Sequence, residues 1–255
     1  MDTETASSRA HWLRTLVPVD DCRTRLVILP HAGGTAGFYR PFAEHLSGLE
    51  VLAAQYPGRQ ERIRENSPAS IEQIALAVID ELDRLPVRTT LVMGHSMGSL
   101  VAFEVARRRP DLVDGLIVSA HRGPSVPSRS RLHLADDAAL IEEVRRMGGT
   151  DELVLSHPEL VGLVTRPLRA DLTVDARYQC PDGARVATPI TVLRGSDDAT
   201  VTEDDALAWQ KHCDTTATCE RLPGGHFFLL DAPRTVAAVV EREAARTGMT
   251  RKRNS

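Results

Sequence analysis

The chain has 255 residues, 42% of them hydrophobic and 26% charged, and its formal net charge is −4. This length and composition fit one large globular domain with a sizeable core. The negative charge argues against a nucleic-acid-binding protein, and neither an apolar leader nor a run of about 18 apolar residues is present, so we expect no signal peptide, no membrane span and a cytoplasmic location.

The cysteines and histidines of the chain show no metal-binding spacing. No C-x-x-C pair and no H-E-x-x-H motif occurs, and no histidine cluster lies beside the four cysteines, Cys22, Cys180, Cys213 and Cys219. Such spacing is typical of reduced thiols rather than of a zinc site or a disulfide framework. The sequence therefore predicts neither a metal nor an organic cofactor.

The first residues carry little pattern. Residues 1–23 offer only Trp12, Leu13 and Leu16 as apolar contacts, so we interpret this segment as an N-terminal arm outside the core. The core is expected to begin at residue 24.

Strand and helix patterns then alternate up to residue 120. Apolar runs predict strands and a 3.6-residue period predicts helices, in the order strand 25–29, helix 38–46, strand 51–56, helix 71–82, strand 89–93, helix 97–108 and strand 112–120. Ser70 or Ser67-Pro68 marks the start of the helix over 71–82. This repeated order favours a mostly parallel, twisted sheet with helices on both faces.

The alternation stops over residues 121–188. Turns rich in proline and serine are followed by two apolar helical stripes, one over 140–147 and one after Pro158, where Pro167 is expected to kink or split the helix. We interpret 121–188 as a helical insertion that covers a site as a lid. The alternative is that these stripes only pack against the core.

The sheet pattern returns at residue 189. A strand over 189–193, a helix over 204–212, a strand over 218–222 and a helix over 232–245 complete a core made of 24–120 and 189–245. The polar, basic tail 246–255 is predicted to be disordered.

The motif Gly94-His95-Ser96-Met97-Gly98 follows a buried strand and precedes a helix. Its two glycines allow the strand and the helix to approach closely, which holds the serine at the carboxyl end of the strand. This context predicts a nucleophile elbow, with Ser96 as the nucleophile. The alternative is a structural Gly-Ser turn.

A serine nucleophile needs a base and a group that orients the base. Asp198 and His226 follow Ser96 in the order Ser, Asp, His, and each comes after a predicted strand of the same sheet. His226 lies in a glycine-rich loop after the last strand, so we predict that it is the base. Asp197 competes with Asp198 for the acid, and we favour Asp198.

Backbone N–H groups are the expected donors to an oxyanion. Met97, the residue after the serine, supplies one donor, and Ala32 in the turn after the first strand is the best candidate for the other. The glycine-rich turn 30–37 matches neither phosphate-binding motif, so nucleotide binding is not expected.

The chain resembles the type II thioesterases that accompany polyketide synthases and nonribosomal peptide synthetases, which have the α/β-hydrolase fold. The resemblance runs from Trp12 to the last helix and is carried by Leu29-Pro30-His31-Ala32-Gly33-Gly34, Tyr56-Pro57-Gly58-Arg59, Gly94-His95-Ser96-Met97-Gly98, Pro167-Leu168-Arg169-Ala170-Asp171 and Pro223-Gly224-Gly225-His226-Phe227-Phe228. Ala199 departs from the family pattern, which commonly has proline there.

The resemblance implies a triad of Ser96, Asp198 and His226, an oxyanion hole at Ala32 and Met97, and a flexible lid over 121–188. It also implies a hydrolase that removes unwanted acyl groups from the phosphopantetheine arm of acyl or peptidyl carrier proteins. We expect the protein to be a monomer. The alternatives are a broad carboxylesterase or acyltransferase with the same triad, and a non-catalytic binding protein with this fold.

Six arginines near the expected site are candidates to meet an acidic carrier protein or its phosphate. They are Arg59, Arg62, Arg64, Arg122, Arg129 and Arg131. The alternative interpretation, which we favour for any one of them, is solvated surface.

Overall fold

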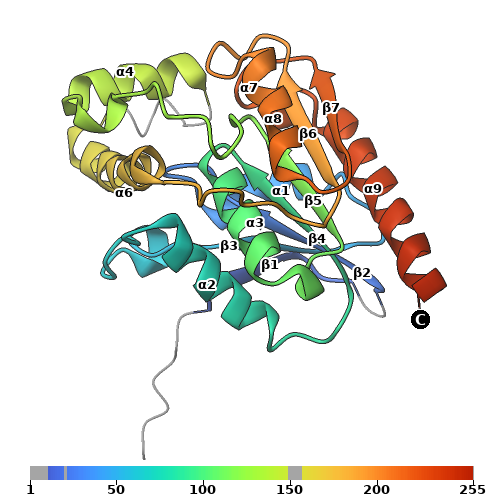
Figure 1. Cartoon of the computed structure of the whole chain (residues 1–255). Helices are drawn as coiled ribbons and strands as arrows, with labels where there is room; N and C mark the ends of the chain where they lie inside the picture. The colour runs from blue at the N-terminus through green and yellow to red at the C-terminus, as the bar shows by residue number, and fades with distance from the viewer. Residues whose placement is uncertain (1–10, 20–21, 149–156, 255) are drawn as a thin grey trace, which may run out of the picture.

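The computed structural model describes residues 11–19, 22–148 and 157–254. Within them, seven strands form one sheet in the order β1-β3-β2-β4-β5-β6-β7, and all neighbours are parallel except β1 and β3 (Figure 1). The predicted mostly parallel sheet with helices on both faces is therefore confirmed.

The strands are β1 Leu13–Val17, β2 Thr24–Leu29, β3 Glu50–Ala54, β4 Thr89–His95, β5 Gly115–Ser119, β6 Ile190–Gly195 and β7 Ala217–Leu222. The α-helices are α1 Arg40–Ala43, α2 Ile71–Leu82, α3 Met97–Arg108, α4 Asp137–Met147, α6 Pro158–Arg177, α7 Glu203–Leu207, α8 Phe228–Asp231 and α9 Pro233–Asn254. Short 3₁₀ helices occupy Ala36–Tyr39, Gln60–Arg62, Pro110–Leu112, Leu132–Leu134 and Ala208–His212.

Strand β4 is the centre of the sheet. It pairs in parallel with β2 on one side and β5 on the other, and all seven of its residues are buried. A strand covered on both faces has no position for a polar surface residue, which explains why this segment reads as a continuous apolar run. Its carboxyl end is the point from which α3 leaves the sheet.

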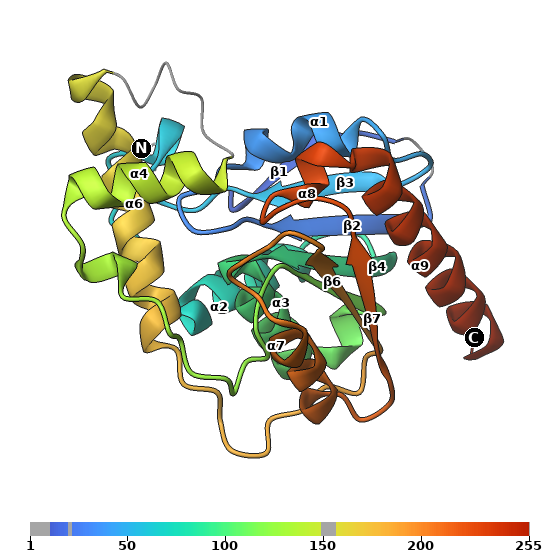
Figure 2. The ribbon, with the colours of Figure 1, turned by 90° about the horizontal axis from the view of Figure 1, so that it is seen from above.

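Helices cover both faces of the sheet, and each face has its own hydrophobic core. Helices α2 and α3 lie on one face and α1, α8 and α9 on the other (Figure 2). Helix α2 illustrates how the sequence specifies this arrangement. The Ser70 hydroxyl accepts a hydrogen bond from the Gln73 N–H at its start, and its buried side chains recur at helical spacing.

The N-terminal segment differs from the predicted arm. Residues 13–17 form β1, which pairs antiparallel with β3, with Leu13 opposite Ala54. An edge strand buries only part of its surface. In β1 only Leu16 is buried, so the apolar pattern of this strand in the sequence is weak. Residues 1–10 and 20–21 of the predicted arm lie outside the described residues.

The prediction of a disordered tail over 246–255 is wrong for 246–254, because α9 continues to Asn254. Buried residues at helical spacing extend past residue 245: Thr247 is 6% exposed, and its hydroxyl donates to the Glu243 carbonyl. The basic composition of the tail concealed this continuing buried face. Ser255 lies outside the described residues.

Residues 121–188 contain α4 and α6, which lie together beyond one end of the sheet (Figures 1 and 2). Leu140 and Val144 of α4 pack against Leu168 of α6. Of the two predicted effects of Pro167, a kink or a split, the split is wrong, because α6 continues through Pro167. Proline removes one helical N–H donor, and the rest of this 20-residue helix is retained. Residues 149–156 lie outside the described part of the insertion.

Candidate active site

Ser96 occupies the tight turn between β4 and α3. Its backbone has φ 51° and ψ −127°, an uncommon conformation for a residue with a side chain. Such conformations cost on the order of 1–3 kcal/mol and persist only where the surroundings enforce them. Here the Ser96 N–H donates to the Ser119 carbonyl at 2.7 Å, which ties the turn to β5.

The two glycines of the motif are required by close backbone contacts. A Cβ atom on Gly94 would lie 2.2 Å from the Gly98 carbonyl oxygen, and one on Gly98 would lie 2.0 Å from the Leu29 carbonyl oxygen. Neither oxygen can move without displacing β2 or α3. The strand-turn-helix context predicted for this motif is therefore present.

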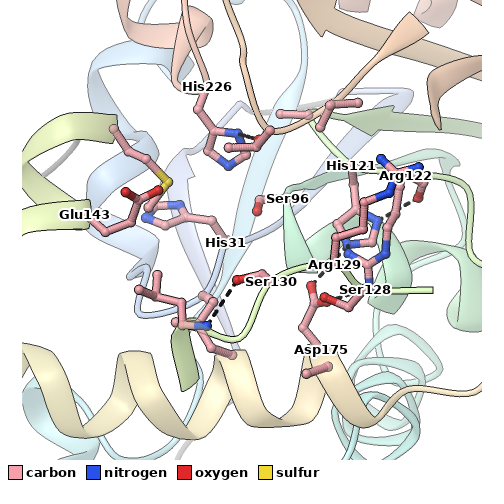
Figure 3. Close-up of a pocket in the computed structure, with 18 of the residues that line it drawn as sticks. His31, Ser96, His121, Arg122, Ser128, Arg129, Ser130, Glu143, Asp175 and His226 are labelled. Atoms are coloured by element: carbon pink, nitrogen blue, oxygen red, sulfur yellow. Dashed lines mark hydrogen bonds and ion pairs between the residues drawn. The ribbon is translucent and has the colours of Figure 1, made fainter. Parts of the chain in front are cut away.

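Ser96 and His226 line the same cavity, which has a volume of about 180 Å³ and is enclosed partly by the insertion (Figure 3). His226 comes from the loop after β7, as its position in the sequence predicted. Insertion residues such as Leu132, Met147 and Leu172 form part of the wall.

Asp198, and not Asp197, is bonded to His226. The Nδ1–H of His226 donates to Asp198 Oδ2 at 2.9 Å. Asp198 is 7% exposed, whereas Asp197 is exposed and accepts a hydrogen bond from the Ser196 hydroxyl. Burial alone would raise the pKa of Asp198, but its hydrogen bond and attraction to His226, together with hydrogen bonds from Thr200, lower it. The carboxylate thus stays ionised beside the imidazole.

The turn after β2 presents Ala32 to the cavity. The Gly34 N–H donates to the His31 carbonyl at 2.9 Å, and Gly33 has φ 75°, as in a type II turn with glycine at its third position. Ala32 lines the cavity with Ser96. Met97 is the first residue of α3, where backbone N–H groups lack helical acceptors. Both predicted oxyanion donors are therefore on segments that border Ser96.

His31 also lines this cavity, and sequence reasoning assigned it no role. Its backbone N–H donates to the Tyr39 hydroxyl at 3.2 Å, and the same hydroxyl lies 2.8 Å from His31 Nδ1. Burial lowers the pKa of His31 to about 3, with further lowering from His226 and Arg59. The ring is therefore neutral at pH 7, and it packs edge-on against Phe38 and Phe227.

A buried ion pair joins the insertion to the turn that carries Ala32. Asp171 of α6 accepts from Arg59 Nη1 at 2.6 Å and from Nη2 at 2.9 Å, and it also accepts from the Gly33 N–H at 2.8 Å. Arg59 in turn donates to the Gly34 carbonyl at 3.1 Å. Arg59 and Asp171 are 2% and 1% exposed. The sequence motifs around both residues were recognised, but not their contact.

A second buried pair lies one helical turn further along α6. Asp175 accepts from Arg122 Nη2 at 2.8 Å, and its other carboxylate oxygen lies 3.0 Å from His121 Nε2. Burial alone would raise the pKa of Asp175. The charges of His121 and Arg122, together with the hydrogen bonds to these two residues, lower this pKa well below its usual value. Two acidic residues on one face of helix α6 therefore attach it to the turn after β2 and to the residues that follow β5.

The favoured interpretation of the arginines as solvated surface is wrong for Arg59, Arg62 and Arg122 and is confirmed for the other three. Arg59 and Arg62 are buried, the latter at 5% exposure with Glu65 as its partner. Arg122 pairs with Asp175. In a further pair, Arg129 bonds to Asp205. Arg129 is nevertheless exposed, as are the two remaining candidates, Arg64 and Arg131.

The four cysteines are free thiols. In the part of the chain that the structure describes, no group of three or more His, Cys, Asp or Glu side chains is arranged to hold a metal ion. No helix among the described residues is long and apolar enough to cross a membrane.

A serine on a strained strand-to-helix turn, a bonded Asp-His pair and a mostly parallel sheet together define an α/β-hydrolase. Residues 24–244 match the family model described as Thioesterase domain. The chain belongs to this family, as its resemblance predicted, and it is a thioester hydrolase.

Several similar proteins are named as thioesterases. The chain is 37% identical to a probable cadicidin biosynthesis thioesterase of Streptomyces griseus, over 92% of this chain and 67% of the relative. It is 36% identical to thioesterase PikA5 of Streptomyces venezuelae, over 86% of this chain and 80% of the relative. Among solved structures, the type II thioesterase BorB from the borrelidin biosynthetic cluster matches with a TM-score of 0.84 and 35% identity, over 91% of this chain and 97% of BorB.

Proposed function

We propose that this thioesterase hydrolyses acyl groups from the phosphopantetheine arm of acyl or peptidyl carrier proteins, with Ser96 as nucleophile, His226 as base and Asp198 as its orienting acid. The observation that carries the proposal is the hydrogen bond of 2.9 Å between His226 and Asp198 at a cavity that also contains Ser96. The relatives named as type II thioesterases support the choice of substrate.

In the first half-reaction, His226 Nε2 takes the Ser96 proton while Ser96 Oγ attacks the thioester carbonyl. The carbonyl π electrons move to oxygen, and the N–H groups of Ala32 and Met97 donate to the resulting oxyanion. The electron pair then returns to re-form the carbonyl, and the C–S bond breaks. The pantetheine thiolate leaves and receives a proton from the His226 imidazolium.

In the second half-reaction, water replaces the thiol. His226 takes a proton from the water as it attacks the acyl-Ser96 carbonyl, and the same two N–H groups stabilise the second oxyanion. Collapse breaks the C–O bond, and His226 returns the proton to Ser96 Oγ. A carboxylic acid is released and the enzyme is restored.

Residues 121–188 act as a lid in this proposal. Leu132, Met147, Leu172 and Ala176 bring apolar surface to the cavity, which supports binding of an acyl group there. The cavity of about 180 Å³ beside Ser96 is where we expect the acyl group to bind.

We further propose that the carrier protein docks outside the lid as a partner of the monomer while its flexible arm reaches Ser96. Binding energy from this remote contact would help to position the carbonyl. Arg59, Arg62 and Arg122 are engaged in ion pairs with Asp171, Glu65 and Asp175, so the proposal does not depend on a basic rim made by these three side chains.

The test compares kcat/KM for one short acyl group on a phosphopantetheinylated carrier protein, on coenzyme A and on N-acetylcysteamine. We expect the carrier protein to be the best substrate. Equal values, or faster hydrolysis of simple oxygen esters, would favour a broad carboxylesterase, and transfer to an added alcohol in place of water would identify an acyltransferase.

A fluorophosphonate probe should label Ser96, and Ser96→Ala should abolish both labelling and turnover. Labelling without any turnover would favour a non-catalytic binding protein.

A further inference from the structure

Thr200 makes three hydrogen bonds to the Asp-His pair. Its hydroxyl donates to Asp198 Oδ1 at 2.6 Å, and its backbone N–H donates to the same oxygen at 2.9 Å. The same hydroxyl oxygen lies 3.0 Å from His226 Nδ1. Thr200 also lines the cavity that contains Ser96.

The hydrogen bonds among Thr200, Asp198 and His226 determine which atoms donate and which accept. The hydroxyl proton of Thr200 points to the carboxylate of Asp198, so a lone pair on Thr200 Oγ1 faces the imidazole. That lone pair and Asp198 Oδ2 are both acceptors. Both receive a hydrogen bond only if the imidazole of His226 carries its proton on Nδ1. This is the tautomer that leaves Nε2 unprotonated and able to take a proton from Ser96.

We propose that Thr200 is a positioning residue for the hydrolysis, which fixes the tautomer and the orientation of His226 by sharing its Nδ1–H with Asp198. The inference rests on the proposed roles of Ser96, Asp198 and His226. The bond of the Thr200 N–H to the side chain two residues earlier is an Asx-type turn, so the loop holds the carboxylate and the hydroxyl in one rigid unit.

Asp198 retains a direct bond to His226 without Thr200, so we expect a partial loss rather than abolition. Thr200→Val keeps the shape of the side chain and its backbone bond, but it removes both bonds of the hydroxyl. Hydrogen bonds to charged groups have energies that correspond to changes of about 10- to 100-fold, and we expect kcat to fall by that factor. KM should change little, because the loss concerns the base and not the binding of substrate.

The test measures kcat and KM for wild type, Thr200→Val, Thr200→Ser and a control, Thr218→Val, which alters an exposed threonine on β7. Proton NMR of each variant follows the low-field resonance of the His226 Nδ1 proton, identified by its loss in His226→Ala. We expect Thr200→Val to lower kcat and shift this resonance. Thr200→Ser should restore both to near wild-type values, and the control should change neither.

Two outcomes would overturn the inference. One is a Thr200→Val enzyme with wild-type kcat and an unshifted resonance. The other is equal loss in Thr200→Ser, which would mean that the methyl group and not the hydroxyl matters. These results differ from failure of the proposed triad, in which Ser96→Ala or His226→Ala would retain wild-type thioester hydrolysis. Thermal unfolding of each variant establishes that a loss of kcat is not a loss of fold.

Discussion

The contact between Arg59 and Asp171 should stabilise the fold and also hold the turn that carries Ala32. In Asp171→Asn, the guanidinium of Arg59 keeps its buried place but loses its countercharge. Removing one partner of a buried pair typically costs about 3–5 kcal/mol. That loss is a large part of the 5–15 kcal/mol by which domains are usually stable.

The double variant Arg59→Met/Asp171→Leu separates the two roles. Apolar residues of similar size often replace a buried ion pair at little cost in stability, so this variant should unfold at a higher urea concentration than Asp171→Asn. It nevertheless leaves the Gly33 N–H without the Asp171 carboxylate, so the turn next to Ala32 loses its anchor. We expect kcat to fall by about 10- to 100-fold, within the range of losing one oxyanion donor.

Urea unfolding followed by circular dichroism and steady-state hydrolysis of an acyl carrier protein thioester measure both quantities. Glu65→Gln is the matched control, because Glu65 also pairs with a buried arginine, Arg62, but its side chain is 41% exposed. We expect it to cost less than about 1 kcal/mol. Wild-type stability in Asp171→Asn would refute the energetic argument, and wild-type kcat in the double variant would refute the role of the anchor.

Three further predictions concern single residues. Gly98→Ala should abolish activity or folding, since the new Cβ would lie 2.0 Å from the Leu29 carbonyl oxygen; soluble, fully active protein would contradict the strained elbow. Asp198→Asn should lower kcat by about 10⁴-fold, and Asp197→Asn should lower it by less than about twofold. If a kinetic assay shows the reverse order, the acid of the triad is Asp197 and not Asp198. For Asp175, whose pKa is lowered on folding, stability is present above its unfolded pKa of about 3.9 and is lost as the pH falls below it. The stability difference between wild type and Asp175→Asn in urea should therefore be full at pH 7 and shrink below about pH 4, and a constant difference would exclude this linkage.

The sequence was sufficient where the determining interactions are local. The helix over 71–82 coincides with α2 because a serine cap and a continuous apolar stripe define both of its ends. The central strand and the turn at Ser96 were found for a similar reason, since burial on both faces gives an apolar run and the close backbone approach requires glycine.

The sequence was insufficient where a residue's role depends on a distant partner. Arg59 and Asp171 are 112 positions apart, and a charged residue among polar neighbours has the same local pattern whether it is solvated or buried in a pair. Edge strand β1 was missed because it pairs with β3 mainly through backbone hydrogen bonds. Such pairing imposes little pattern on the amino-acid sequence.

The meeting of Asp198 with His226 combines both situations. Gly195 ends β6, and a Cβ atom there would lie 2.3 Å from the Gly225 carbonyl oxygen, so the loops after β6 and β7 approach as closely as backbones can. The Asp197 N–H donates to the Gly224 carbonyl at 2.9 Å, which uses the backbone of Asp197 to join the loops and leaves its side chain outside. The next side chain, that of Asp198, then turns inward to His226. The glycines could be read from the sequence, but the choice between two adjacent aspartates depended on which one supplies the joining N–H.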